Sequence, residues 1–580
     1  MRPYRRSLPY ALAFLALVLA ACSPATAPAG GAGSIANGGG TAAVSAPKQL
    51  TLGILEEPKG WAPWIDLSSG GGAYESRYLV LATLTVRDDQ DQIAPVLAPS
   101  VPSLDQGDWR INPDGTMDQT WRLRPNLTWH DGQPLSAEDF VFGWQVATDP
   151  DLPNPASLAR QYIDSASAPD PQTLQLHFSS TTPTADSALF YPLPRHLLAD
   201  HLAQDLTQFP DLDYWTTGQI AAGPYRLTGW VPGAYQEYAA FDGYALGRPH
   251  IDTVRLRFLQ DSNTLLANIL AGEVDVALPQ TVSLDMAAQL EGSWATPDSG
   301  NQVILYPDGQ LYFMSFQNRA EYAKPSAALD PRLRQAFYET IDKDAVNTAG
   351  MTGVAVLADS WIPPDDPRHA VVADSIPPWS FDLAQAQRML DDAGWQRGPD
   401  GILVNRGTGE RMETDIRVTG VKGHVNELAV MADNWRKVGA TVSETVIPAP
   451  LLADLQYRAT FPFVEHTGAR VDLAWEFNNM ACTRAARPET RWGGNRNGYC
   501  NPTADPLIQQ LQTTIPIDQR ARLQEQIMAI TLKQDLVELP LYWSVTPYTV
   551  AKGITGPGVL HGGIHGGSDP PWNIQVWDRV

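Results

Sequence analysis

The chain has 580 residues, a formal net charge of −23 and 43% hydrophobic residues. We do not expect so acidic a chain to bind nucleic acid or anionic lipid, because both bind to basic patches on proteins. Its length exceeds what one hydrophobic core organises, so we expect two or more domains.

The first residues have the pattern of an export signal. Arg2, Arg5 and Arg6 precede an apolar run over residues 10–19, which is too short for a permanent membrane span. Residues 1–21 are therefore predicted to be a cleaved signal peptide.

Small residues lead to Cys22, and the segment Leu19-Ala20-Ala21-Cys22 resembles the bacterial lipobox. The resemblance implies cleavage before Cys22 and lipidation of its thiol, which would hold the protein at a membrane surface. The alternative is ordinary secretion with an incidental cysteine. A run of Ala, Gly, Ser, Pro and Thr follows, so residues 22–47 are predicted to be the lipidated cysteine and a flexible tether.

The chain has three cysteines, and with Cys22 set aside Cys482 and Cys500 form an even pair. In an oxidising compartment their expected state is a disulfide that closes a short loop. Two separate free thiols are the alternative, which exported proteins usually avoid.

The remaining chain alternates strand-like and helix-like segments, which indicates α/β domains. Short alternating or apolar segments predict strands at residues 49–55, 120–123, 254–259, 275–278 and 539–543. Helical apolar spacing predicts a helix beginning at Ser136 and helices over residues 263–271, 330–345, 382–393, 426–438 and 519–534. Gly272 and Gly394 are predicted to end two of these helices.

Several motifs follow one another over nearly the whole chain. The longest is WRLRPNLTWHDGQPLSAEDFVFGW at residues 121–144, in which a strand leads through a turn into a helix. The others are GPYRL at 223–227, GEVD at 272–275, DPRLRQAF at 330–337, AQAQRMLDDAGW at 384–395, GYCNP at 498–502 and LPLY at 539–542. In this order they resemble the family 5 solute-binding proteins of ABC importers, the oligopeptide- and dipeptide-binding type.

The resemblance implies an α/β fold of the bilobal periplasmic-binding-protein type II class with an extra inserted domain, the three-domain, cluster C type. Two segments would cross between the lobes, as hinge closure around a ligand requires. The implied boundaries are residues 48–80, 200–310 and 539–580 for domain I, residues 81–199 for the inserted domain II, and residues 311–538 for domain III.

We find no enzyme motif in the sequence: a phosphate loop, a G-x-S-x-G elbow and an H-E-x-x-H zinc pair are all missing. The run His130-Asp131-Gly132 is interpreted as a turn, because glycine after aspartate is a turn signal. The predictions are therefore no enzymatic activity, no catalytic residue and no cofactor.

Four further histidines are candidate metal ligands by residue type. His196 and His201 have the spacing of a surface helix. His561 and His565 lie in a glycine-rich stretch, and the entropy lost on ordering that stretch opposes metal binding. We therefore expect no metal site.

Aromatic and polar side chains concentrate in WEFNNMACTRAARPETRWGGNRNGY at residues 475–499, as a binding cleft requires. In the resembled family the corresponding loop of domain III contacts ligand, and peptide-binding members place there an aspartate that pairs with the ligand's α-amine. That aspartate pattern is missing here, and Glu476 or Asp472 could take its place. The predicted ligand-binding residues are Trp492, Gly493, Asn495, Arg496, Glu476, Asp472, Trp475, Trp61 and Tyr74. The alternatives are a surface loop stapled by a disulfide, and packing roles for Trp61 and Tyr74.

The expected function is that of a substrate-binding lipoprotein of an ABC importer, which captures a peptide by hinge closure and delivers it to a membrane permease. The same fold binding an oligosaccharide or another small solute, such as a metal chelate or an opine, is one alternative. An extracytoplasmic hydrolase and a sensory or adhesion module are others. The expected partners are the ligand and the permease and ATPase subunits, with no nucleic acid and with membrane contact through the lipid anchor only. We expect a monomer at the outer face of the cytoplasmic membrane, in the periplasm or at the cell surface.

Overall fold

The computed structural model describes residues 46–64, 72–89, 92–152, 162–187, 190–296, 299–377, 379–471, 477–558 and 570–580. The predicted signal peptide, most of the predicted tether and several predicted residues lie outside the described residues: Cys22, Asp472, Trp475, Glu476, His561 and His565. The elements below belong to one compact unit, Pro47–Val580.

Within the described chain, eleven strands form one large sheet in the order β17-β16-β18-β12-β19-β11-β1-β10-β9-β8, with β13 paired to β19. Their bounds are β1 Gln49–Ile54, β8 Tyr225–Val231, β9 Tyr235–Ala240, β10 Thr253–Phe258, β11 Val276–Ala277, β12 Gln302–Phe316, β13 Val356–Leu357, β16 Glu413–Val418, β17 Thr441–Val446, β18 Val464–Arg470 and β19 Glu538–Val550. The strands predicted at residues 49–55, 254–259, 275–278 and 539–543 are confirmed, and the last of them is much longer than predicted.

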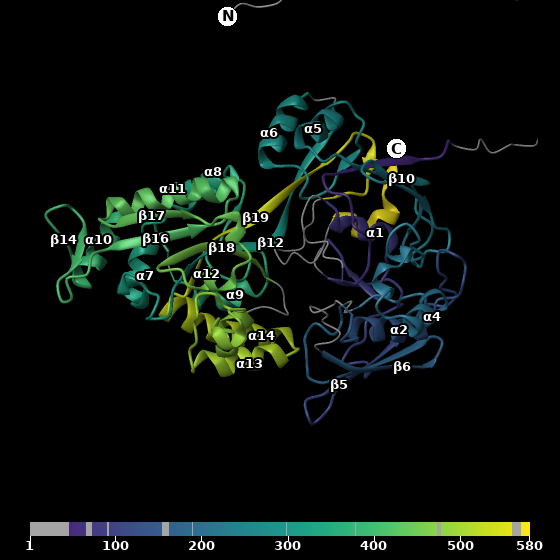
Figure 1. The fold of residues 1–580 in the computed structure, drawn as a ribbon, viewed down its shortest axis with the longest axis horizontal. Helices are drawn as coiled ribbons and strands as arrows, with labels where there is room; N and C mark the ends of the chain where they lie inside the picture. Colours follow the sequence, from purple (N-terminus) through teal and green to yellow (C-terminus); the bar gives the residue numbers. More distant parts are fainter. Residues whose placement is uncertain are drawn as a thin grey trace, which may run out of the picture. The chain divides into compact units, whose positions relative to one another are not determined.

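The strands β12 and β19 run antiparallel side by side (Figure 1). Gln302, the first residue of β12, pairs with the last residue of β19, which also pairs with β11 there. Near the other end, Ser315 pairs with Glu538, and β12 also pairs with β18 there. These two strands therefore carry the large sheet from the strands around β1 to the strands around β16. Their pairing is irregular after Pro307, which lacks an amide hydrogen, and Gly309 adopts a φ of +73°.

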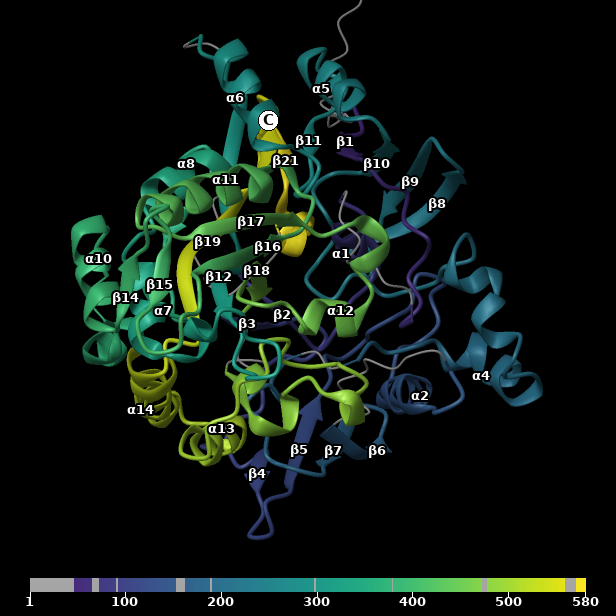
Figure 2. The ribbon, with the colours of Figure 1, turned by 60° about the vertical axis from the view of Figure 1, so that its left-hand side comes forward.

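A separate antiparallel sheet, β4-β5-β7-β6, packs against α2 (Figure 2). The bounds are β4 Trp109–Ile111, β5 Met117–Arg122, β6 Ile163–Asp170, β7 Thr173–Phe178 and α2 Ala137–Thr148. Ser136 caps α2 as predicted, and the Asp139 carboxylate accepts from the Ser136 amide to complete a capping box. In the turn before this helix, Gly132 has a φ of +84°, which confirms the turn interpretation.

The other described α-helices are α1 Arg77–Val80, α4 Arg195–Gln204, α5 Ser262–Leu270, α6 Leu284–Ser293, α7 Pro331–Tyr338, α8 Lys343–Met351, α9 His369–Val372, α10 Leu383–Asp392, α11 Lys422–Lys437, α12 Leu455–Ala459, α13 Ala504–Thr513 and α14 Ile517–Met528. Two-stranded pairs are formed by β2 Thr85–Arg87 with β3 Ile93–Pro95, β14 Trp395–Arg397 with β15 Leu403–Asn405, and β20 Ile554–Thr555 with β21 Asp578–Arg579. Gly272 and Gly394 follow α5 and α10 with φ values of +73° and +88°, so both predicted helix ends are confirmed. His196 and His201 lie on α4, as the spacing predicted.

The single helix predicted over residues 330–345 is wrong, because the structure has two helices there, α7 and α8. The Asp342 carboxylate accepts from the Ala345 amide and caps α8, as Asp330 caps α7. Ile341 between the helices is buried in the same core as both of them. The apolar spacing therefore continues across the break and conceals it.

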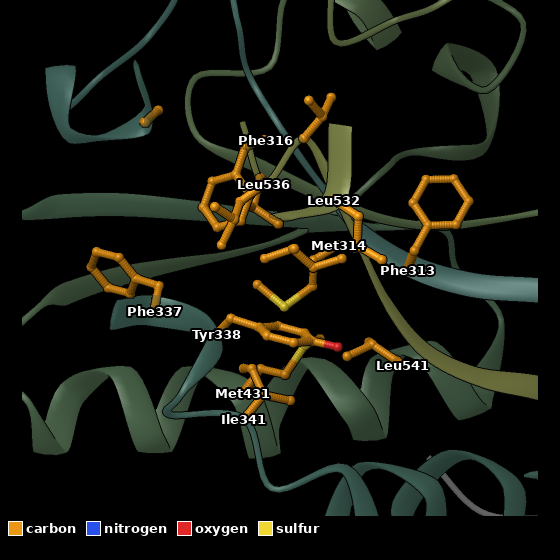
Figure 3. Packing of buried hydrophobic residues seen from close by; sticks show 14 of the residues in the cluster. Phe313, Met314, Phe316, Phe337, Tyr338, Ile341, Met431, Leu532, Leu536 and Leu541 are labelled. Carbon is orange, nitrogen blue, oxygen red and sulfur yellow. The ribbon is translucent and has the colours of Figure 1, made fainter. Parts of the chain in front are cut away.

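A large core lies between β12, β18 and β19 and the helices α7, α8 and α11. Figure 3 shows Met314 of β12 over Tyr338, with Met431 of α11 on the other side of the ring. The ring centres of Phe337 and Trp435 lie 4.7 Å apart in the same core. This packing fixes one face of β12, so side chains on its other face lie in a defined position.

Candidate ligand-binding site

The predicted binding loop is closed and braced. A disulfide joins Cys482 and Cys500, with Cα atoms 4.4 Å apart and a sequence separation of 18. Within the loop, the Asn495 amide donates to the Arg484 carbonyl at 2.6 Å, and the Ala486 amide donates to the Asn495 carbonyl at 2.9 Å. The loop is therefore held by the disulfide and by hydrogen bonds within it.

Arg319 binds the loop to the rest of the fold. Its guanidinium donates to the backbone oxygens of Ala459, Ala486 (2.7 Å) and Arg496 (2.6 Å). Its central carbon also lies 5.8 Å from the ring centre of Trp492. Burial lowers the pKa of Arg319, but a guanidinium stays charged at neutral pH. One partly buried cation thus binds three carbonyl groups, of which that of Ala459 also accepts from Gln317 Nε2 at 3.2 Å.

The loop covers a recess of about 70 Å³, which we call the acidic recess. Its polar lining includes Ser315 of β12, Glu465 and Thr467 of β18, Glu538 of β19, Asn479, and Asn495, Arg496 and Asn497 of the loop. A space of this size admits a water molecule or the ammonium end of a ligand.

Glu465 is 3% exposed and is neutralised by two arginines. The Arg458 Nε atom donates to one carboxylate oxygen at 2.9 Å, and the Arg496 Nε atom donates to the other at 2.8 Å. Arg496 also donates to the Thr467 hydroxyl at 3.0 Å. Arg496, which lines the recess, and Arg458, which lies beside it, are therefore both directed at Glu465.

Glu538 has no such cation bonded to it within the described chain. Its carboxyl group accepts from Asn497 Nδ2 at 2.8 Å and from the Ser315 hydroxyl at 3.4 Å. Burial raises the pKa of Glu538 to about 7, although the charge of Arg496 and these hydrogen bonds oppose the rise. Near neutral pH this carboxyl group exchanges a proton easily, so it is the group in the recess best suited to receive a cation.

Tyr74 lines a second recess of about 240 Å³, which we call the arginine recess. The Arg77 guanidinium carbon lies 3.5 Å from the ring centre of Tyr74 and 4.8 Å from that of Tyr78, and Arg77 donates to the Tyr78 hydroxyl at 3.0 Å. Arg87 and Tyr191 also line this recess. Guanidinium groups beside aromatic rings suit a carboxylate or another planar anion.

Trp61 lies in the core. It is 4% exposed, and its ring centre is 5.6 Å from that of Trp230. It packs in the cluster that contains Tyr225, beneath the strands around β1. The structure thus places Trp61 in a packing position, while Tyr74 reaches a recess.

A buried polar network lies on the other side of β18. The side chains of Glu427 and His466 are fully buried and hydrogen-bonded, and the Tyr542 hydroxyl donates to the second oxygen of Glu427. Burial alone would raise the pKa of Glu427, but His466 and Tyr542 lower it overall. The network joins α11 to β18 and β19, so its role is structural.

None of the helices in the described part of the chain is long and apolar enough to cross a membrane. Among the same residues, no group of three or more His, Cys, Asp or Glu side chains is placed to hold a metal ion.

The family model of the bacterial extracellular solute-binding proteins, family 5, matches residues 100–480. The chain belongs to this family. Membership implies an exported protein that binds a solute.

Two relatives of this family member cover most of its length. Protein XP55 of Streptomyces lividans is 27% identical over 491 residues, which cover 82% of each chain. The oligopeptide-binding protein AppA of Bacillus subtilis is 23% identical over 534 residues, which cover 89% of each chain.

Solved structures agree on the fold. An oligopeptide-binding protein from Thermus thermophilus, complexed with a pentapeptide, matches with a TM-score of 0.67 and 21% identity over 92% of this chain and 96% of that one. The periplasmic EDTA-binding protein EppA matches with a TM-score of 0.72 and 18% identity over 92% and 97%. The fold is therefore the multi-domain periplasmic-binding-protein type II fold, as the motifs predicted.

Within this family fold, the structure separates the predicted site residues into groups. Asn495 and Arg496 line the acidic recess, Trp492 and Gly493 belong to the loop that covers it, and Tyr74 lines the arginine recess. Sequence reasoning missed Glu465, Glu538, Ser315, Arg458 and Arg319. The available signal was a lone carboxylate within or beside an apolar strand, as in FVEHTG and VELPLYW.

Proposed function

We propose that this family member is the substrate-binding lipoprotein of an ABC importer, which captures a peptide between two lobes and delivers it to a membrane permease. Family membership supports the solute-binding role, and the names of its relatives support a peptide as the solute. The protein acts as a monomer with permease and ATPase subunits and has no enzymatic activity of its own.

The proposed lobes use the boundaries expected from the motifs. Domain I comprises residues 48–80, 200–310 and 539–580, domain II residues 81–199, and domain III residues 311–538. The strands β12 and β19 are the two connections, and the hinge lies where their pairing is irregular. Support comes from Asp308, which accepts from the Ser544 and Thr546 hydroxyls at 3.1 and 2.9 Å in place of regular strand pairing.

The observation that carries the peptide proposal is Glu538, a buried carboxyl group to which no cation of the described residues is bonded. A peptide's terminal ammonium in the acidic recess supplies that cation and favours the ionised carboxylate. The arginine recess has the chemistry for the opposite terminus, because Arg77 and Arg87 suit a carboxylate. A peptide is a ligand that carries both groups.

The test is isothermal titration near pH 6.5 with tetra-alanine, its N-acetyl form and its C-terminal amide. We expect the free peptide to bind and to release protons, so that the heat differs between buffers of different ionisation enthalpy. Acetylation should weaken binding at least about tenfold, because it removes the ammonium. Equal binding of the acetylated peptide would refute the role of the acidic recess. A random peptide library that gives no binding at all would refute the peptide cargo.

The main alternative is another small solute bound by the same fold, since a protein that binds EDTA has a similar fold. Titration of metal–EDTA chelates and oligosaccharides under the same conditions separates this alternative. Recovery of every peptide intact after long incubation separates binding from hydrolysis.

The proposed anchor is tested by replacement of Cys22 by Ser. The wild-type protein should incorporate a radiolabelled fatty acid and partition into detergent, whereas the variant should do neither. A variant that still partitions into detergent would refute anchoring through Cys22.

A further inference from the structure

The structure has a further cavity of about 590 Å³ that shares no lining residue with the acidic or the arginine recess. It lies among residues of α7, α8 and α9 and the segments that follow α9 and β13. Its volume is in the range of small-molecule sites. We call it the lysine pocket.

One wall of the lysine pocket is apolar and aromatic. Trp379 and Tyr338 meet edge to face with ring centres 4.3 Å apart, and Ile376 extends this surface. Phe381 also lines the pocket and is 48% exposed. These side chains together give the pocket an apolar and aromatic wall, which suits the apolar body of a ligand.

The other wall carries Lys343. Its ammonium donates to the Ala358 carbonyl at 2.6 Å and lies 5.0 Å from the ring centre of Tyr338. Within the described chain, that carbonyl is its one hydrogen-bond acceptor, whereas an ammonium group has three N–H donors. Burial lowers the pKa of Lys343 to about 8, and the charge of Asp359 only partly opposes this. The ammonium therefore has donors to spare and no directly bonded counter-ion.

Two of the three carboxylates that line the pocket have partners. Asp359 is paired with His369 at 3.0 Å, and Asp342 caps α8. Asp344 is exposed at the rim. A second cation in the cavity would meet the Lys343 ammonium, while an anion there would satisfy it.

We propose that the lysine pocket binds a small amphipathic carboxylate, with its carboxylate at the Lys343 ammonium and its apolar body against Trp379 and Phe381. This site is separate from the proposed peptide site. An ionised carboxylate also meets the ammonium with charge-assisted hydrogen bonds, which are stronger than bonds between neutral groups.

The probe is 3-phenylpropanoate, compared with 3-phenylpropylamine and 3-phenylpropanol, which carry the same body and a different head group. Binding is measured by ligand-observed saturation transfer and by calorimetry at pH 7. Three variants of the full chain are used: Lys343→Met, which removes the charge and keeps the stem; Ala373→Trp, which fills the cavity from an exposed lining position; and Lys533→Met as the matched control. Lys533 also donates to a backbone oxygen, that of Asp374 at 3.0 Å, but it is exposed and outside the pocket.

We expect the carboxylate to bind the wild-type protein and Lys533→Met equally. Lys343→Met should weaken that binding at least about tenfold, and Ala373→Trp should abolish it. Any of three results overturns the proposal: no carboxylate binding to the wild-type protein, equal or tighter binding of the amine, or unchanged binding to Lys343→Met. Thermal unfolding of each variant shows that it is folded. Peptide titration of Lys343→Met should match the wild type, so failure of this proposal is distinguishable from failure of the peptide proposal.

Discussion

Replacement of Glu538 by Gln removes a buried ionisable group but keeps its size and one acceptor oxygen. In the wild-type protein this oxygen accepts from Asn497 and Ser315, and the carbonyl oxygen of the introduced glutamine can retain both bonds. The substitution therefore tests the energetic effect of ionisation and little else.

The magnitude follows from the pKa. A rise from 4.5 to about 7 in the folded state corresponds to about 3 kcal/mol, at about 1.4 kcal/mol for each tenfold change in proton affinity. Below pH 4.5 both states are protonated, so ionisation has no effect on stability. Between pH 4.5 and about 7 only the unfolded chain ionises, so the wild-type protein loses stability as the pH rises. Above about pH 7 the loss is constant.

The variant should therefore be close to the wild type in stability near pH 4 and more stable by up to about 3 kcal/mol near pH 8. A chain of several domains unfolds in more than one step. The quantity to measure is hence the free energy of local opening, from hydrogen exchange of peptides covering residues 534–545 across this pH range. A difference between variant and wild type that does not change with pH would refute the reasoning.

Replacement of Glu465 by Gln is the matched control in the same recess. Glu465 is bonded to Arg458 and Arg496, so its replacement leaves two partly buried arginines without a counter-ion. We expect a loss of about 1–3 kcal/mol at neutral pH, the opposite sign to the effect at Glu538.

Three further predictions concern the loop and the core. Arg319→Met should lower the stability of the loop region by about 1–3 kcal/mol and increase hydrogen exchange over residues 484–498, because the Ala486 and Arg496 carbonyls lose their donor while that of Ala459 keeps Gln317. Unchanged exchange over these residues would contradict this role of Arg319. Replacement of Cys482 and Cys500 together by Ser should lower the free energy of unfolding by about 3 kcal/mol, the chain-entropy estimate for a sequence separation of 18. Thermal unfolding with and without reductant measures this loss, and the unfolding of the double variant should not change with reductant. Glu427→Gln should destabilise the protein at pH 7, and the loss should shrink as the pH falls, because the lowered pKa of Glu427 contributes stability above its ordinary value that is lost as the pH falls through the folded value. A loss that does not change with pH would indicate packing alone.

The secondary structure was largely predictable where a local signal existed. Ser136 and Asp139 form a capping box that indicates the start of α2, and Gly394 indicates the end of α10. The break between α7 and α8 was missed because Asp342 acts as a helix cap within an uninterrupted apolar pattern. The spacing of apolar residues shows which residues face a core. Two consecutive helices that pack on the same core can therefore have one unbroken apolar pattern.

The recesses were only partly predictable. Asn495 and Arg496 stood out as polar residues beside aromatic ones. The partners that give them a role, Glu465 and Glu538, come from two strands that are neighbours of β12 and lie 73 residues apart in sequence. The same holds for Lys343, whose environment depends on Tyr338, Ala358 and Trp379 together.

The sequence by itself determined the family, the α/β class and the even pair of cysteines, because these depend on short patterns and on their order along the chain. Only the tertiary structure decided that Glu538 is buried with no cation bonded to it among the described residues, while Glu465 is bonded to two arginines. It also decided that Trp61 belongs to a core and Tyr74 to a recess. The reason is physical: the pKa of a carboxyl group and the exposure of a ring are set by desolvation and by neighbours in space, and neither is a property of the adjacent residues.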